Sequence, residues 1–158
     1  MSWLEPGTFK CVVASTPLVS IDLVVRDAED RVLLGKRNNR PAQGYWFVPG
    51  GRIKKNESLD AAFRRLTREE LGLGIERSEA SSLGVYEHFY ADSVFGVSPD
   101  THYVVVAHAL NVTSNLLDLP RDQHSDYRWW QISELLDSKQ VHDNTKAYFS
   151  AAFLPNTP

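Results

Sequence analysis

The chain has 158 residues, of which 42% are hydrophobic and 23% are charged, a balance typical of one soluble globular domain with a buried core. Its net charge of −3 provides no overall positive field, so we expect neither nucleic acid nor a membrane as its partner. Cys11 is the only cysteine, which excludes an internal disulfide and a cysteine-built zinc site. The first ten residues lack the pattern of a secretory signal, so we expect a cytoplasmic location.

The first half of the chain predicts strands around a glycine turn. Residues 18–25 are rich in apolar and β-branched side chains and predict a strand. A polar turn over residues 27–30 separates it from a second strand that begins at residues 31–34, and the pair resembles a hairpin. A short strand over residues 45–48 ends at Pro49, Gly50 and Gly51.

The clearest predicted helix spans residues 58–71, because its apolar side chains recur at near-helical spacing and Gly72 can end it. Further strands are expected over residues 83–90, 103–110 and 127–130, and a second helix over about 144–153. These elements predict an α/β fold in which helices pack on the faces of a sheet, within one domain over residues 1–158.

Two carboxylates, Glu69 and Glu70, stand in the last turn of this helix, where the helix dipole favours cations instead. A bound Mg²⁺ would compensate them, and the Gly50 carbonyl could supply a further oxygen ligand. The alternative is a solvated helix end in which Arg65 pairs with Glu69 one turn away.

The stretch over residues 50–73 resembles the Nudix box. The family pattern combines glycine, glutamate and arginine at fixed spacings, and the chain matches it at Gly51, Glu57, Arg65, Glu69, Glu70, Gly72 and Leu73. Leu66 replaces the family's first helical glutamate and Thr67 replaces an aliphatic residue. Residues 66, 69 and 70 share one helix face, so the usual trio of carboxylates is reduced to a pair.

This departure, together with the runs LGKRNNRPAQGYWFVPGGR and DQHSDYRWW, resembles the Nudix subfamily of GDP-mannose mannosyl hydrolases. The resemblance implies the Nudix fold, an α/β/α sandwich, in a homodimer that uses Mg²⁺, with Mn²⁺ as an alternative. It also implies hydrolysis of GDP-mannose or GDP-glucose to GDP and the free sugar, with inversion at the anomeric carbon.

The resemblance assigns a role to each candidate site residue. The implied metal ligands are the Gly50 carbonyl, Glu70 and Gln123, and the implied base is His124. Arg37, Arg52 and Tyr103 would bind the diphosphate, and Asp22 and His88 would hold the sugar. Trp3, Leu4 and Phe9 would contact the nucleotide.

Each assignment has a structural alternative. His124 could be a solvated loop residue, Asp22 and His88 could be hydrogen-bonded within the sheet, and Tyr103 could be a core aromatic. Two other functions also stay open. One is a conventional Nudix pyrophosphohydrolase that attacks phosphorus and yields GMP, and the other is a silent sensor that binds a nucleotide sugar.

Overall fold

The computed structural model describes residues 4–120 and 124–150. Its α-helices are α1 (Pro6–Ser15), α2 (Leu59–Leu71), α3 (Ile132–Asp137) and α4 (Asp143–Lys146), and two short 3₁₀ helices span Arg77–Glu79 and Ser114–Leu116. Its strands are β1 (Leu18–Arg26), β2 (Val32–Arg37), β3 (Trp46–Phe47), β4 (Gly50–Arg52), β5 (Ser81–Tyr90), β6 (Thr101–Asn111) and β7 (His124–Trp130). None of the helices among these described residues is long and apolar enough to cross a membrane.

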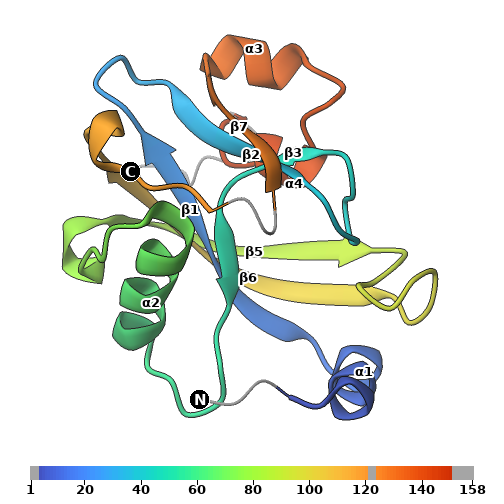
Figure 1. Cartoon of the computed structure of the whole chain (residues 1–158). Helices are drawn as coiled ribbons and strands as arrows, with labels where there is room; N and C mark the ends of the chain where they lie inside the picture. The colour runs from blue at the N-terminus through green and yellow to red at the C-terminus, as the bar shows by residue number, and fades with distance from the viewer. Residues whose placement is uncertain (1–3, 121–123, 151–158) are drawn as a thin grey trace, which may run out of the picture.

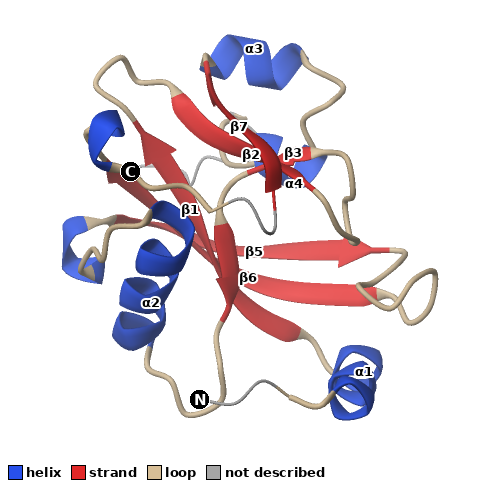
Figure 2. Cartoon of the chain, in the orientation of Figure 1, coloured by secondary structure: helices blue, strands red, loops and turns tan. Residues whose placement is uncertain are grey.

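The strands form one seven-stranded mixed sheet (Figure 2). Its main order is β3-β2-β1-β6-β5, while β4 pairs with β1 and β7 pairs with β2. The β1–β6 pairing is parallel and continuous from Leu18 opposite Tyr103 to Arg26 opposite Asn111. The predicted hairpin of β1 and β2 forms, but the two strands pair only where Arg26 meets Val32. They then diverge, and β4 takes the place beside the first half of β1.

Strand β1 supplies both faces of the sheet with core side chains. Ile21, Leu23 and Val25 pack against α2, whereas Val24 belongs to the core on the opposite face. Helices α3 and α4 cover that opposite face, and Figure 1 shows them on the other side of the sheet from α2. The predicted α/β/α sandwich is therefore confirmed. Because side chains alternate along a strand, Asp22 shares its face with Val24.

Helix α2 forms as predicted. Ser58 caps its first turn by accepting a hydrogen bond from the Ala61 N–H at 3.1 Å. Gly72 ends it in the left-handed conformation with φ 73°. A Cβ at this glycine would lie 2.5 Å from the Asp118 side chain, so the space as well as the angle requires glycine.

The predicted second helix over residues 144–153 is wrong in length. Helix α4 ends at Lys146, and turns follow it to residue 149. Helix α4 buries only Thr145, and Tyr148 is buried in the turn that follows. A single turn of helix is therefore enough to place both side chains in the core. Residues 151–153 lie outside the described part of the chain.

Two helices and a strand were not predicted. Helix α1 begins at Pro6 and buries only Val13, so it has almost no apolar stripe for a periodicity argument to find. Helix α3 is only six residues long. Strand β4 falls on residues that the sequence assigns to a turn, and its pairing with β1 depends on a distant partner.

Candidate functional site

A pocket opens over β1, β4 and β6, near the centre of the sheet. Its empty volume is about 540 Å³, including the part open to solvent, which suits a small-molecule site. Most of the predicted site residues line it together: Asp22, Arg37, Gly50, Arg52, His88, Tyr103 and His124.

The register of the sheet explains how these residues meet. Residues directly opposite each other on neighbouring strands point to the same face. Four such pairs supply the pocket: Ser20 with Arg52, Asp22 with Gly50, His88 with Tyr103, and Arg37 with His124. The site is therefore assembled by strand pairing and not by one loop.

The inner end of the pocket carries Asp22 and His88, which are both buried. The hydroxyl of Tyr148 donates a 2.6 Å hydrogen bond to Asp22 Oδ2 and lies 3.4 Å from His88 Nε2. The structure thus confirms hydrogen bonding within the protein for both residues, and it also places both at the pocket wall.

Burial favours the neutral form of both groups. It raises the pKa of Asp22 to about 7, although the Tyr148 hydrogen bond and Arg37 act against the rise. Burial, together with nearby His142, lowers the pKa of His88 to about 4. His88 is therefore neutral at pH 7, and Asp22 is close to its midpoint.

Arg37 and Arg52 make another side of the pocket positive. Arg37 is held by a 2.9 Å hydrogen bond from Nε to the Pro41 carbonyl. The guanidinium of Arg52 lies 4.2 Å from the centre of the Phe9 ring. Tyr103 also lines this side, and burial raises the pKa of its hydroxyl, which stays protonated and able to donate.

His124 is the first residue of β7 and is only 2% exposed, so it lies in a strand and not in a polar loop. Its ring packs on Gly35 of β2, where a Cβ would lie 2.7 Å from His124 Cγ. Its Nδ1 atom is 3.3 Å from the hydroxyl of Tyr127, which also donates to the Pro120 carbonyl. The alternative of a solvated surface histidine is therefore excluded.

The face of α2 that carries the box residues packs toward β4. Leu66 is 2% exposed, and its Cδ2 atom lies 2.5 Å from the place where a Cβ at Gly51 would stand. Leu66 therefore fills the space beside β4. Glu70 lies one turn further along this face and is 5% exposed. A buried carboxylate at the end of a helix is the setting in which a cation is most stabilising.

Glu69 behaves differently from Glu70. It is half exposed and accepts a 3.1 Å hydrogen bond from Arg65, the pair expected for a solvated helix end. Arg65 also donates twice to Glu57, at 2.6 and 2.8 Å, and once to the Arg52 carbonyl at 2.9 Å. Arg65 therefore ties the basic loop and β4 to α2.

The donor set fits a hard divalent cation. The Glu70 carboxylate and the Gly50 carbonyl are oxygen donors, the type that Mg²⁺ prefers, and Mg²⁺ needs only one or two carboxylates. The described residues contain no cluster of three or more acidic, histidine or cysteine side chains, so a site here would rely on few protein ligands. The third expected ligand, Gln123, lies outside the described residues.

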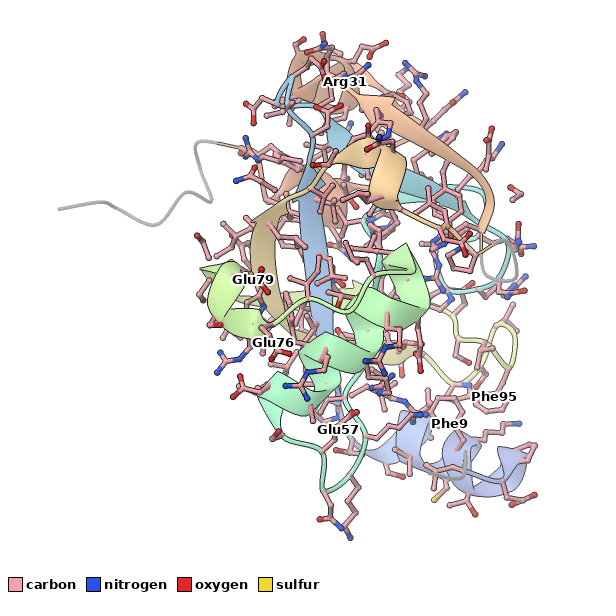
Figure 3. All side chains as sticks on the ribbon, turned by 60° about the vertical axis from the view of Figure 1, so that its left-hand side comes forward. Phe9, Arg31, Glu57, Glu76, Glu79 and Phe95 are labelled. Carbon is pink, nitrogen blue, oxygen red and sulfur yellow. The ribbon has the colours of Figure 1, made fainter. Side chains whose placement is uncertain are left out.

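The three N-terminal candidates differ in their positions. Phe9 of α1 lines a second pocket, of about 730 Å³ including solvent, together with Arg37 and Tyr103. Its ring also makes an edge contact with Phe95 at 5.6 Å, and Figure 3 shows both residues near α1. Leu4 is 46% exposed and does not line either pocket, and Trp3 lies outside the described residues.

Two residues that shape the pocket could not be identified from the sequence. Tyr148 contacts Asp22 across 126 positions of chain, and nothing local marks it. Gly35 lies within a strand pattern, where an isolated glycine indicates that another group packs closely on the backbone. This is the one clue that the sequence gives to its role.

Comparisons with known proteins agree with this architecture. The NUDIX domain model matches residues 16–153. The low-salt glycan biosynthesis protein Agl8 of Haloferax volcanii is 42% identical over 120 residues, which cover 76% of this chain and 74% of that protein.

Two solved structures share the fold. The MutT protein of Methanosarcina mazei superposes with a TM-score of 0.70 at 20% identity, covering 85% of this chain and 92% of the other. A MutT NUDIX hydrolase of Burkholderia pseudomallei gives 0.69 at 26% identity, covering 85% and 96%.

Proposed function

The chain belongs to the Nudix family, and from that premise we propose that it hydrolyses GDP-mannose or GDP-glucose to GDP and the free hexose. Nudix hydrolases generally use divalent metal ions, and Mg²⁺ is the ion proposed for this chain. The relative Agl8 is named for glycan biosynthesis, which supports a sugar-linked substrate. We also propose a homodimer as the working form.

One observation carries the choice of reaction. Leu66 occupies a buried position on α2 one turn before Glu70, while His124 lines the pocket from strand β7. A carboxylate at residue 66 could have activated water against phosphorus, and leucine cannot. We infer that the base is His124 of β7, which lines the pocket and acts on water beside the sugar.

The proposed roles follow from the two sides of the pocket. Arg37 and Arg52 bind the diphosphate and stabilise the negative charge that GDP carries as it leaves. Mg²⁺, held by Glu70, the Gly50 carbonyl and Gln123, would supply further positive charge to the leaving diphosphate when bound. Asp22 and His88 hold the sugar hydroxyls, and Tyr103 donates to a phosphate oxygen.

His124 is the proposed general base. It takes a proton from the water that attacks the anomeric carbon from the face opposite GDP, as in an inverting glycosidase. The oxygen of water becomes the anomeric hydroxyl, and the bond between the anomeric carbon and the phosphate oxygen breaks. Contacts with Gly35 and Tyr127 hold the His124 ring in one orientation for this proton transfer.

The decisive experiment is hydrolysis of GDP-mannose in ¹⁸O-labelled water with Mg²⁺. We expect the label in mannose, unlabelled GDP, and β-mannose as the first anomer seen by NMR. Label in a phosphate product, or GMP as the main nucleotide, would instead indicate a pyrophosphohydrolase. Binding without any product would indicate a sensor.

A further inference from the structure

The hydroxyl of Tyr148 touches both polar residues at the inner end of the pocket, yet Tyr148 itself does not line that pocket. It is 4% exposed and stands just after α4, with its ring edge against Tyr86 at 4.7 Å. A hydroxyl has one proton, and when Asp22 is ionised, above its pKa of about 7, the short bond to Asp22 Oδ2 uses that proton. Toward His88 Nε2 the same oxygen can therefore only accept.

The contact with Tyr148 therefore predicts where the proton of the His88 imidazole lies. If Tyr148 accepts from Nε2, then Nε2 carries the hydrogen, and the neutral ring keeps its lone pair on Nδ1. Asp22 is left with Oδ1 as its uncommitted oxygen. That atom faces Gly50, where a Cβ would lie only 2.6 Å away, so glycine keeps the space in front of it open.

We propose that Tyr148 is a positioning residue that turns Asp22 and His88 into a pair of acceptors for two hydroxyl groups of the substrate. Two acceptors repel phosphate oxygens and require donors, and a hexose supplies several. The inner end of the pocket then recognises the sugar, while Arg37 and Arg52 recognise the diphosphate. This assignment rests on the proposed function for the identity of the ligand, but not for the proton arrangement.

The proton arrangement is tested by ¹H–¹⁵N correlation spectra of the histidine side chains at pH 8. We expect His88 to be the Nε2–H tautomer in the native protein and to become a mixture in Tyr148→Phe. Tyr86→Phe is the matched control, because it removes a neighbouring hydroxyl from the same aromatic cluster. A native His88 with its proton on Nδ1 would overturn the proposal without any variant.

The sugar role is tested by steady-state kinetics. Tyr148→Phe should lower kcat/KM for GDP-mannose about tenfold, the usual cost of weakening one hydrogen bond to a charged group. The inhibition constant of GDP should not change, because GDP has no hexose. Tyr86→Phe should change neither value.

Deoxy analogues of GDP-mannose separate positioning from a general loss of structure. The two analogues that lack the hydroxyls bound by Asp22 and His88 should be poor substrates of the native enzyme. For these two, Tyr148→Phe should lower kcat/KM little further, because the variant has already misplaced the acceptors that they cannot use. Equal losses for all analogues, or weaker GDP binding in Tyr148→Phe, would refute the sugar role. If the native protein hydrolyses no GDP-hexose, the proposed function fails, and the His88 tautomer still decides the part played by Tyr148.

Discussion

The imidazole of His124 rests directly on the backbone of Gly35, with so little space that a Cβ would come within 2.7 Å of Cγ and 2.8 Å of Cδ2. The two residues come from neighbouring antiparallel strands, β2 and β7, next to a register shift between Lys36 and Arg37. A side chain at residue 35 would therefore push the ring out of its present plane.

Gly35→Ala tests this contact. The new methyl group should displace the imidazole and lower kcat about 10- to 100-fold, because catalysis is sensitive to errors of about 1 Å. The free energy of unfolding should fall by only about 1 to 3 kcal/mol, the usual cost of one extra methyl in a packed core. In a His124→Gln background the same change should not lower kcat further, and an additive loss would show that Gly35 acts elsewhere.

His124→Gln tests the base itself. We expect kcat to fall about 10²- to 10⁴-fold, the range for loss of a general base, with little change in KM. The measurement is initial-rate kinetics with GDP-mannose and saturating Mg²⁺. His102→Gln is a suitable control, since His102 stacks on Phe89 at 4.4 Å outside the pocket. A His124 variant with near-native kcat would rule out the proposed role.

Glu70→Gln and Glu69→Gln distinguish the metal ligand from its neighbour. Glu70 is buried, whereas Glu69 is half exposed and bonded to Arg65. Glu70→Gln should therefore abolish most Mg²⁺-dependent turnover and weaken Mn²⁺ binding, which paramagnetic relaxation of water measures directly. Glu69→Gln should do much less, and equal effects from both would mean that the two carboxylates share the ion.

Leu66→Glu restores the family's missing carboxylate, and we expect it to fail as a switch of mechanism. Burying an unpaired charge in place of a core leucine should reduce the free energy of unfolding by about 2 to 5 kcal/mol. The labelled-water product should still be mannose, because the diphosphate would also have to move for attack at phosphorus. Label in GDP or GMP from this variant would show that one carboxylate decides which bond breaks.

The lowered pKa of His88 predicts how stability depends on pH. Between about pH 6.5 and 4 the unfolded chain binds a proton at this residue and the folded chain does not. The contribution of His88 to stability therefore decreases as the pH falls through this window, by up to about 3 kcal/mol, while the raised pKa of Asp22 contributes in the opposite direction. Denaturant titrations of native protein and His88→Gln should show a shallower acid loss in the variant, and identical slopes would contradict the prediction.

The elements that the sequence predicts best are those with local determinants. Helix α2 has a serine cap, a helical stripe of apolar residues and a glycine end, so its limits were correct to within one residue. Helix α1 has only Val13 to bury, and its position depends on packing near the end of the sheet rather than on its own pattern.

The pocket shows the same division. The box residues were identifiable because their spacing lies within one helix and one loop. The pairing of His88 with Tyr103, the packing of His124 on Gly35 and the Tyr148 bond to Asp22 depend on strand register and on a chain end far from its partner. Such contacts have no local signature, and only the resemblance to a family suggested some of the residues.

The parallel pairing of β1 with β6 has a consequence for synthesis. Strand β1 is buried along most of its length and leaves the ribosome long before Thr101–Asn111 exists to pair with it. The edge of β1 that pairs with β6 therefore stays unpaired in the nascent chain until residues 101–111 are made, and the bond from Tyr148 to Asp22 forms later still. Slow translation or heat during expression should expose this protein to aggregation more than a fold whose first strands pair with each other along their length.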